Sequence, residues 1–351
     1  MEIKANTYQD NGAASLTASI IGASGYSGAE LTKILARHRR VKIGGLFANS
    51  LVGKRVDEVH PWLHGDILAL YEAYAPELIE KSDVVFIALP SGEAMKFVPE
   101  LLDRGKKVID LGGDFRLKDP ALYRKYYGRD HTATDYLERA IYGLPEWNRA
   151  AIAAGTLIAN PGCYPTSALL PLMPLLKESV IAGRGIIINS VSGTSGAGRS
   201  ASVDLIFSEV NESVKAYKVG THQHNPEIRT VLGSVAAEDV SLTFIPHLVP
   251  ITRGIYSNIC APLNSDISEG DVAAIYDAYY ADAPFVRWSS TAIPEIRGVA
   301  HTNYIDIGVR VDRDNGQIVL LSAIDNLVKG AAGQAVQNMN ILFGFEETEG
   351  L

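Results

Sequence analysis

A glycine-rich turn near the start of the chain restricts the fold more than any other feature of the sequence. The apolar residues 17–22 lead into Gly22-Ala-Ser-Gly25-Tyr-Ser-Gly28, and residues 28–37 follow with leucine and isoleucine at helical spacing. Glycines in such a turn let the backbone reverse tightly and approach a pyrophosphate, which the free amides of the helix N-terminus stabilise. The spacing is GxxGxxG rather than GxGxxG, so a strand-to-helix turn without a ligand is the alternative. The motif predicts an α/β nucleotide-binding domain, with candidate cofactor-binding residues Gly22, Ser24, Gly25, Tyr26, Ser27 and Gly28.

Short apolar runs alternate with helical patterns over residues 17–116. Residues 41–48, 83–89 and 107–111 are strand-like, and residues 76–82 form an amphipathic stretch before the third strand. Strands that are apolar along nearly their whole length are typical of a parallel sheet covered on both faces. This predicts a first domain, residues 17–160, built on a parallel sheet.

The pattern changes after residue 160. The chain continues with longer, more amphipathic strands, residues 185–192, 240–245, 254–261, 304–311 and 318–323. The turn residues Asp314-Asn315-Gly316 separate the last two. A mixed or antiparallel sheet in a second domain, residues 161–324, is therefore expected. Residues 326–343 read as a packing helix that returns to the first domain, and 351 residues fit two domains of roughly 150 residues each.

Composition excludes several classes of protein. Hydrophobic residues make up 47% and charged residues 21%, which excludes disorder, collagen-like repeats and coiled coil. No apolar run approaches the ~20 residues of a membrane-spanning helix, so no membrane partner is expected. Residues 1–16 lack the apolar centre of a signal peptide, and we read them as an N-terminal extension on a cytoplasmic protein. With 32 Lys and Arg against 40 Asp and Glu, the net charge of −8 argues against a nucleic-acid partner.

The residues after the second strand bear on the choice of cofactor. NAD sites usually hold the ribose 2′-hydroxyl with a carboxylate at this point. Here the chain reads Ala48-Asn49-Ser50 and then Gly53-Lys54-Arg55, with no acid before Asp57. This favours NADP, with Ser50 and Lys54 as candidates for binding its 2′-phosphate.

The two cysteines have different surroundings in the sequence. Cys163 and Cys260 are too few for a disulfide scaffold or a cysteine zinc site, and Cys260, in a strand-like run, is interpreted as structural. Cys163 lies in Asn160-Pro-Gly-Cys-Tyr-Pro-Thr166, where Pro165 suits the first position of a helix. This places Cys163 at the N-cap, where free amides and the helix dipole stabilise a thiolate relative to a reference pKa of ~8.5.

The helix that follows Cys163 contains two prolines. Pro171 and Pro174 lie where the helix interior would be. Because proline lacks a backbone amide and clashes with the preceding turn, they are expected to break or kink this helix.

A nucleophilic cysteine needs a proton-transfer partner, and one segment concentrates histidines. It reads Thr221-His222-Gln-His224-Asn-Pro-Glu227, with Asn225 and Pro226 as cap and first turn of a helix, so both histidines are expected in the preceding loop. Glu227 is a candidate for orienting one imidazole, as a carboxylate does in a hydrolase triad. The His-x-His spacing also occurs in metal sites, but no ligand cluster stands nearby in the sequence, so no metal is expected.

Two further segments suit an anionic substrate. Residues 190–199 follow a strand and offer hydroxyls, backbone amides and an arginine, with candidates Ser192, Ser195, Gly196 and Arg199. Residues 110–116 end another strand with Asp110, Asp114 and Arg116. A simple turn and a simple salt bridge are the alternatives. Together with the nucleotide loop and the thiol, these segments indicate a thioester reaction in which an activated acyl group and an aldehyde interconvert by hydride transfer.

Over residues 17–351 the chain resembles the N-acetyl-gamma-glutamyl-phosphate reductases, relatives of aspartate-semialdehyde dehydrogenase. The segments that carry this resemblance are GASGYSGAEL (22–31), LGGDFRL (111–117), YGLPE (142–146), NPGCYPT (160–166), SGTSGAGR (192–199), FSEVNES (207–213), HQHNPEI (222–228), PHLVPITRGI (246–255) and DNLVKGAAGQAVQNMN (325–340). Their length and number make chance similarity untenable.

The resemblance implies an α/β fold with a Rossmann-type parallel-sheet domain, completed by residues 325–351, and an α+β catalytic and dimerisation domain with a mixed sheet. It implies a homo-oligomer, dimer or tetramer, with NADPH as hydride donor and Asn326 at the cofactor. It implies Cys163 as nucleophile and His222 as acid/base supported by Glu227, with His224 as the alternative histidine.

The reaction implied is NADPH-dependent reduction of N-acetyl-L-glutamyl 5-phosphate to the 5-semialdehyde and phosphate, in arginine biosynthesis. In it the His222 imidazolium would protonate the oxyanion, and Arg116 with residues 192–199 would hold the phosphate. Two alternatives stay open. One is a related acyl-phosphate reductase of carrier-linked lysine biosynthesis, and the other is a non-catalytic NADP-binding sensor.

Overall fold

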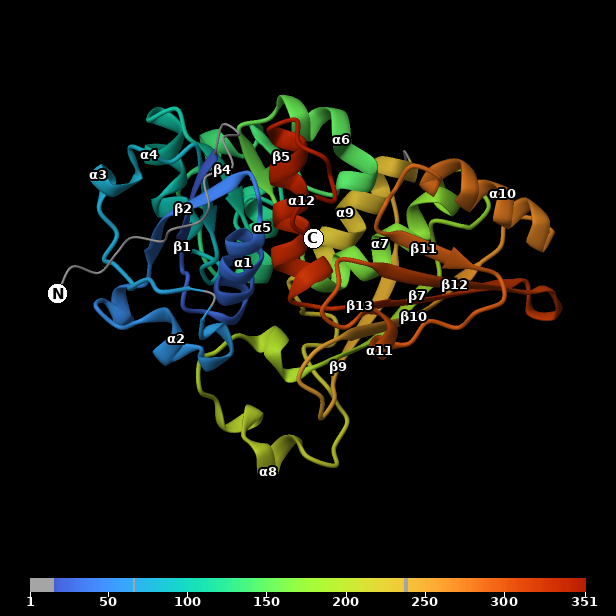
Figure 1. Ribbon diagram of the computed structural model, residues 1–351. Helices are drawn as coiled ribbons and strands as arrows, with labels where there is room; N and C mark the ends of the chain where they lie inside the picture. Colours follow the sequence, from blue (N-terminus) through green and yellow to red (C-terminus); the bar gives the residue numbers. More distant parts are fainter. Residues whose placement is uncertain (1–15, 66, 237–238) are drawn as a thin grey trace. The chain divides into compact units, whose positions relative to one another are not determined.

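The computed structural model describes residues 16–65, 67–236 and 239–351 (Figure 1). These residues form two compact units, which are described separately below. The first comprises the described residues up to Pro120, Asp130–Asn160 and Ala332–Leu351, and the second comprises Ala121–Arg129 and Pro161–Ala331. The extension expected for residues 1–16 lies outside the described residues except for Leu16, which begins the first strand.

The first unit contains a six-stranded, wholly parallel sheet in the order β2-β1-β3-β4-β6-β5. The strands are β1 (Leu16–Ile21), β2 (Val41–Phe47), β3 (Val84–Ile87), β4 (Lys107–Asp110), β5 (Ala140–Tyr142) and β6 (Leu157–Ala159). All four residues of β3 are buried, so both faces of the sheet are covered at its centre. The strand order reverses between β1 and β3, the place where such sheets bind ligands. The parallel sheet predicted from the sequence is confirmed.

Helices and short turns connect these strands. The helices are α1 (Tyr26–Arg37), α2 (Val56–Val59), α3 (Pro76–Ile79), α4 (Val98–Asp103), α6 (Pro145–Ala154) and α12 (Gly333–Leu342), and α5 (Pro120–Tyr127) runs from the first unit into the second. All ten residues of α12 are buried, and the Asn338 side chain donates hydrogen bonds to the carbonyl of Gly143 and to Oδ1 of Asn160. The C-terminal helix is therefore part of the first unit's core.

The C-terminal helical segment differs from the single helix predicted for residues 326–343. A π-helical turn, Val328–Ala332, precedes α12. The amide of Gly330 donates to the carbonyl of Asp325, five residues earlier, and the Asp325 carboxylate accepts the amides of Leu327 and Val328. These bonds replace the usual first turn of an α-helix.

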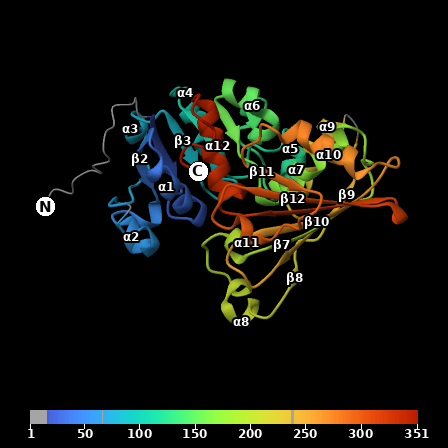
Figure 2. The same ribbon diagram turned by 45° about the vertical axis from the view of Figure 1, so that its right-hand side comes forward.

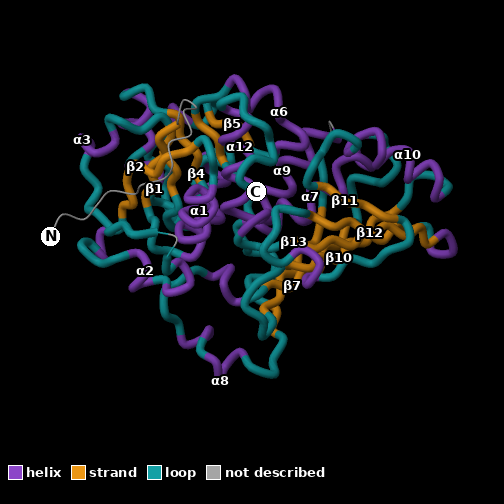
Figure 3. Tube along the Cα trace, viewed as in Figure 1, coloured by secondary structure: helices purple, strands orange, loops and turns teal. Residues whose placement is uncertain are grey.

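The second unit contains a seven-stranded mixed sheet in the order β11-β12-β13-β10-β7-β9-β8 (Figure 3). The strands are β7 (Ile186–Ser192), β8 (Lys215–Ala216), β9 (Leu242–Leu248), β10 (Ile255–Pro262), β11 (Val286–Ser289), β12 (Ile305–Asp312) and β13 (Gln317–Ile324). β7 pairs with β9 and β11 with β12 in parallel, while the remaining pairs are antiparallel. The mixed sheet predicted for this region is confirmed.

The helices of the second unit pack on this sheet and on one another. They are α7 (Cys163–Lys177), α8 (Phe207–Val210), α9 (His224–Ala236), α10 (Glu269–Tyr280) and α11 (Ile296–Val299). α7 packs against β10 and β13, and α9 and α10 pack against α7. Figure 2 shows that α8 lies on a long excursion that projects away from this sheet. Nowhere in the described residues is there a helix long and apolar enough to cross a membrane.

The sequence predicted that Pro171 and Pro174 break or kink α7, and a break is wrong, because the helix continues through both prolines. Each proline deprives the carbonyl four residues earlier of its helical hydrogen bond. Distant side chains replace both bonds: the Ser322 hydroxyl donates to the carbonyl of Ser167 at 2.6 Å, and the Tyr280 hydroxyl donates to that of Leu170. The helix therefore stays intact because β13 and α10 satisfy its orphaned carbonyls.

Candidate active site

The glycine turn between β1 and α1 needs glycine at two positions. Gly22 has a φ of +89°, and a β-carbon there would lie 2.4 Å from the carbonyl oxygen of Ala88. A β-carbon on Gly28 would lie 2.3 Å from the carbonyl oxygen of Gly22. The helix begins at Tyr26 with Gly25 as N-cap, no capping side chain and no acid in its first turn. No acid of this first turn competes for the first amides of the helix, which suits a dinucleotide pyrophosphate.

The remaining candidates of this turn lie beside it. The carbonyl of Ser24 accepts a hydrogen bond from Nε2 of His60, a buried side chain, while Tyr26 is 38% exposed at the helix start. Ser27 is the second residue of α1 and is half-buried. His60 was missed in the sequence, because its contact with this loop depends on the tertiary fold.

The segment after β2 has one cation that no carboxylate neutralises within the described residues. Arg55 forms a bidentate ion pair with Asp57, and this hydrogen-bonded guanidinium lowers the pKa of the Asp57 carboxyl to about 2. Lys54 is exposed and forms no ion pair with any described residue, and Ser50 is exposed in the turn Asn49–Leu51. Lys54 and Ser50 thus remain available to a phosphate.

Cys163 is the first residue of α7, so this helix starts two residues earlier than predicted and its N-cap is Gly162. The reason is local: Gly162 is extended, and its carbonyl accepts the first helical hydrogen bond, from the amide of Thr166 at 2.9 Å. The Thr166 hydroxyl donates to the same carbonyl. Cys163 is half-buried, with its thiol at the positive end of the helix dipole.

Glu227 contacts the backbone just before Cys163. Its Oε1 accepts the amide hydrogen of Gly162 at 2.8 Å, and the side chain is buried near the start of α9. The carboxylate expected to orient an imidazole therefore also fixes the N-cap of the cysteine helix. This bond joins α9 to the start of α7.

Three aromatic rings surround the imidazole of His222. Its ring centroid is 5.7 Å from that of Tyr164, 5.6 Å from that of Tyr217 and 5.5 Å from that of Phe244. Burial, with a smaller contribution from Lys218, lowers the pKa of His222 to about 3. The imidazole is therefore neutral at neutral pH, whereas the sequence analysis assigned the imidazolium to the reaction.

Hydrogen bonding determines the tautomer of this neutral ring. Nδ1 of His222 accepts the backbone amide of His224 at 3.1 Å, so the proton of the neutral ring is on Nε2. His224 is the first residue of α9 rather than part of the preceding loop, and its ring centroid is 4.7 Å from that of His222. Only His222 remains in the loop.

Two tyrosine hydroxyls join the cysteine helix to the histidine loop. The hydroxyls of Tyr164 and Tyr217 are 3.0 Å apart. Burial raises the pKa of both, that of Tyr217 to about 12, and the negative charge of the Cys163 thiolate contributes in each case. Cys163, Tyr164, Tyr217 and His222 therefore form one cluster. Tyr217 was missed in the sequence because nothing distinguishes it from the chain's other tyrosines.

The π-helical turn packs against Cys163. A β-carbon on Gly330 would lie 2.8 Å from Cβ of Cys163, so only glycine fits. Because π turns are uncommon and concentrate at functional sites, the turn itself supports this location. The sequence signal that could have indicated this turn is Gly330, a glycine inside a predicted helix.

The serine-rich segment after β7 is tied to the segment before β10. The amides of Gly193, Thr194 and Ser195 donate to the carbonyls of Gly254, Ile251 and Thr252. Ser192 is buried and its hydroxyl donates to the carbonyl of Gly193. Gly196, within the turn Thr194–Ala197, and Arg199, after it, are exposed.

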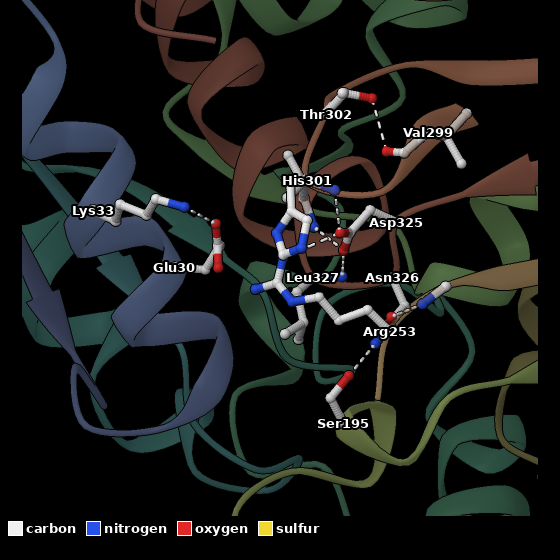
Figure 4. A network of polar contacts seen from close by, with 12 residues as sticks. Glu30, Lys33, Ser195, Arg253, Val299, His301, Thr302, Asp325, Asn326 and Leu327 are labelled. Carbon is white, nitrogen blue, oxygen red and sulfur yellow. Dashed lines mark hydrogen bonds and ion pairs between the residues drawn. The ribbon is translucent and has the colours of Figure 1, made fainter. Parts of the chain in front are cut away.

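Asn326 lies at this segment. Its Nδ2 donates to Oγ of Ser195 at 3.0 Å, and its Oδ1 accepts the amide of Gly254 at 2.7 Å (Figure 4). The structure thus brings a predicted cofactor residue together with a predicted phosphate residue. Figure 4 also shows the neighbouring Asp325 carboxylate accepting from the Arg253 guanidinium and from the amide of His301.

Arg116 belongs to the first unit. Its Nε donates to the carbonyl of Asn160 and its Nη2 to that of Leu111, each at 2.8 Å. The side chain therefore fixes the backbone three residues before Cys163. The guanidinium that was predicted to bind phosphate therefore also donates hydrogen bonds to these two backbone carbonyls.

Asp110 ends β4, and Asp114 follows it. Asp114 accepts the amides of Gly92 and Ala94. Asp110 accepts the amide of Gly112 at Oδ1, while its fully buried Oδ2 has no hydrogen-bond partner among the described residues. Burial, with repulsion from Asp114, raises the pKa of Asp110 to about 7. No group of three metal-ligating side chains occurs within residues 16–65, 67–236 and 239–351.

Comparison with known families covers nearly the whole chain. Residues 17–155 match the family described as "Semialdehyde dehydrogenase, NAD binding domain", and residues 163–326 match "Semialdehyde dehydrogenase, dimerisation domain". N-acetyl-gamma-glutamyl-phosphate reductase of Pelotomaculum thermopropionicum is 53% identical over 95% of this chain and 96% of its own length. That of Geobacillus kaustophilus is 46% identical over 96% and 98%.

Solved structures share the fold. Aspartate semialdehyde dehydrogenase II of Vibrio cholerae has a TM-score of 0.73 at 18% identity, covering 94% of this chain and 98% of that one. The enzyme of Candida albicans, solved with NADP, has a TM-score of 0.70 at 16% identity, covering 93% and 98%.

Proposed function

The chain belongs to the N-acetyl-gamma-glutamyl-phosphate reductase family, and we propose that it reduces N-acetyl-L-glutamyl 5-phosphate to the 5-semialdehyde with release of phosphate, in arginine biosynthesis. The observation that carries this proposal is the cluster of Cys163, Tyr164, Tyr217 and His222. It combines a thiol at a helix N-terminus with a neutral imidazole whose Nε2–H can donate a hydrogen bond. Both groups are required for acyl transfer through a thioester.

Cys163 is the nucleophile of this proposal. Its thiolate attacks the acyl carbon, the bond from that carbon to the phosphate oxygen breaks, and phosphate leaves with the bonding electrons. The N-terminus of α7 stabilises the thiolate before attack, since the dipole and free amides favour negative charge there. Glu227 contributes by holding the N-cap amide of Gly162 in place.

His222 is the acid/base group of the proposal. Reduction of the thioester leaves a negatively charged oxygen on the tetrahedral carbon, and Nε2–H of the neutral imidazole donates a hydrogen bond to it. The electron pair of this oxygen then re-forms the carbonyl, the carbon–sulfur bond breaks, and the Cys163 thiolate and the aldehyde are released. This replaces the imidazolium of the sequence analysis with a neutral donor, because burial opposes a charged ring. His224 is held at the start of α9.

Phosphate binding is assigned to the segment after β7. Ser192, Ser195, Gly196 and Arg199 line it, with Asn326 fixing Ser195. Arg116 is proposed to act on the same anion. Arg199 is exposed, so its charge is accessible to an entering anion.

The cofactor of the proposal is NADPH, which supplies hydride to the acyl carbon when bound. The turn Gly22–Gly28, with the amides at the start of α1, is assigned to its pyrophosphate, including Ser24, Gly25, Tyr26 and Ser27. Lys54 and Ser50 are assigned to the 2′-phosphate, because Arg55 is already paired with Asp57. We also propose a homo-oligomer, dimer or tetramer, which the match to a dimerisation domain supports.

The reaction run in reverse tests the proposal. With N-acetylglutamate semialdehyde, phosphate and NADP, the purified protein is expected to form NADPH, measured by its absorbance. No NADPH at any phosphate concentration would contradict it, and turnover only with a carrier-linked aminoadipate semialdehyde would favour the lysine-pathway alternative. Cys163→Ser should abolish turnover while retaining NADP binding, and Cys260→Ser is the matched control with unchanged turnover.

A further inference from the structure

A tight turn after α11 carries a histidine at a position that glycine fits best. The amide of Thr302 donates to the carbonyl of Val299 at 3.1 Å, Ala300 has a φ of −55° and a ψ of 133°, and His301 has a φ of +64°. These angles are those of a type II turn, whose third residue is usually glycine because its φ is positive. A histidine there strains the backbone, and residues with such strain concentrate at functional sites. The imidazole of His301 is therefore a candidate for a role that glycine cannot fill.

The imidazole accepts a hydrogen bond from an arginine side chain. Nη1 of Arg253 lies 3.0 Å from Nδ1 of His301 and 3.0 Å from Oδ2 of Asp325, and the amide of His301 donates to the same Oδ2 at 2.7 Å (Figure 4). A guanidinium only donates, so Nδ1 of His301 is the acceptor. Because Nη1 carries its two hydrogens in the plane of the guanidinium, two acceptors at this nitrogen fix the orientation of that plane.

The backbone around Arg253 lies against the segment assigned to phosphate. The carbonyls of its neighbours Thr252 and Gly254 accept the amides of Ser195 and Gly193. A β-carbon on Gly193 would lie 2.8 Å from the amide nitrogen of Arg253. Arg253 is therefore the arginine whose backbone packs directly on the turn proposed to bind the anion, although the sequence assigned it no role.

The side chain of Arg253 stays close to the same segment. Its guanidinium bonds Asp325, and the next residue, Asn326, donates from Nδ2 to Oγ of Ser195 at 3.0 Å. The Arg253 side chain is only 15% exposed, and that of Asp325 is fully buried. Since the carboxylate offsets part of the positive charge, the direction in which the guanidinium points its donors decides how well it binds an oxyanion.

We propose that Arg253 is a further phosphate-binding residue of the reaction and that His301 is a positioning residue that orients its guanidinium. The ligand is a phosphoryl oxyanion, which is the phosphate of the acyl phosphate or free phosphate in the reverse direction. The inference rests on the proposed function in taking residues 192–199 as the phosphate-binding segment. Because a guanidinium binds phosphate through two parallel hydrogen bonds, losing its orientation should weaken phosphate binding more than it slows the chemical steps.

Two substitutions at His301 separate the imidazole from the backbone. His301→Gly removes the acceptor and relieves the strain, whereas His301→Asn keeps an acceptor oxygen in a residue that tolerates positive φ. In the reverse assay His301→Gly should raise KM for phosphate by about five- to tenfold, while kcat and KM for the semialdehyde change less than about twofold. His301→Asn should restore most of the loss. A merely structural histidine would instead be replaced by glycine without a change in KM.

Ser179→Gly is the matched control. Ser179 is exposed just after the end of α7 and also has a positive φ, +56°. Glycine there relieves the same kind of strain away from Arg253, so KM for phosphate should stay at the value of the parent protein. A His301→Gly variant with the parent's KM for phosphate, or a rise confined to KM for the semialdehyde, would overturn the proposal.

Binding of inorganic phosphate tests the same inference without turnover. A ligand that binds the folded state raises Tm, so phosphate should raise Tm of the parent protein above its value in sodium chloride of equal ionic strength. His301→Gly and Arg253→Lys should show at most about half of this rise, because lysine keeps a charge beside Asp325 but lacks the planar fork of donors. Equal rises in all three proteins, or no rise in the parent, would overturn the inference. A parent protein that shows these shifts but forms no NADPH would contradict the proposed function alone.

Discussion

The carboxylate of Glu227 accepts the amide hydrogen of Gly162 at 2.8 Å, so a side chain of α9 holds the residue directly before Cys163. The two residues are far apart in the sequence, and both are buried. Since Gly162 is the N-cap of α7, this bond determines where the thiol stands relative to the first amides of the helix.

Glu227→Gln and Glu227→Ala separate two roles of this side chain. Glutamine keeps an acceptor oxygen for Gly162, so kcat/KM should fall by no more than a few fold. Alanine leaves a buried amide without an acceptor, which should cost about 1–3 kcal/mol of stability and a larger loss of kcat/KM. Equal losses in both variants would mean that the negative charge, acting on an imidazole, matters more than the hydrogen bond.

Gly330→Ala should displace the thiol. The new β-carbon would lie 2.8 Å from Cβ and 3.2 Å from Cα of Cys163, neither of which is a flexible chain end. We expect about 1–3 kcal/mol of destabilisation and a changed rate of Cys163 alkylation by iodoacetamide, followed on the Cys163 peptide. Gly270→Ala in α10 is the control, because a β-carbon there meets only ordinary contacts. An alkylation rate unchanged in Gly330→Ala would show that the π turn does not position the thiol.

Removing a donor to the proline-interrupted helix should destabilise the second unit. Tyr280→Phe leaves the carbonyl of Leu170 without its substitute partner, at a cost of about 1–3 kcal/mol. Tyr279→Phe, on the same helix, removes a hydrogen bond to Glu178 at the surface and should cost less than about 1 kcal/mol. Thermal unfolding of the two variants gives the comparison. Equal shifts in Tm would argue that the carbonyl of Leu170 does not need the hydroxyl.

Asp110→Asn should change how stability depends on pH. The pKa of Asp110 is raised to about 7 in the folded chain, so the folded state retains a proton that the unfolded chain releases at about pH 4. The stability from this proton is complete at low pH and is lost as pH rises toward 7. Asparagine keeps the acceptor for Gly112 but does not titrate.

The advantage of Asp110→Asn over the parent should therefore grow between pH 5 and pH 8, on the order of 2 kcal/mol, measured by urea unfolding. The exposed Asp103→Asn is the control and should show no such growth. A constant difference across this pH range would mean that Asp110 is charged in the folded protein throughout.

Features that depend on neighbours in the sequence were predictable. The turn needs glycine at Gly22 and Gly28 because a β-carbon at either position would clash with neighbouring backbone atoms. This requirement is visible in the sequence as the spacing of the glycines. The longer strands of both sheets follow from their apolar patterns in the same way, whereas β5, β6, β8 and β11, of two to four residues each, were missed because they are too short to show a pattern. The helix start near Cys163 was predicted within two residues, because proline and glycine limit where a helix begins.

Features that depend on partners distant in the sequence were not. Pro171 and Pro174 end a helix by local rules, and only Ser322 and Tyr280, from other elements, make it continue. Likewise the sequence indicates a histidine near a thiol. The burial that lowers the pKa of His222, however, comes with the rings of Tyr164, Tyr217 and Phe244, which lie on separate segments. Tertiary packing determined both outcomes.

The place of α12 in the first unit has a consequence for biosynthesis. This helix packs against α1, α6 and β4, and every one of its residues is buried. A ribosome makes it after all of residues 161–331, so the second unit can fold while the first still lacks one wall of its core. Until α12 emerges, the apolar surface that it covers is exposed to water and to other nascent chains. We therefore expect the first unit to need chaperone protection for longer than the second unit during synthesis.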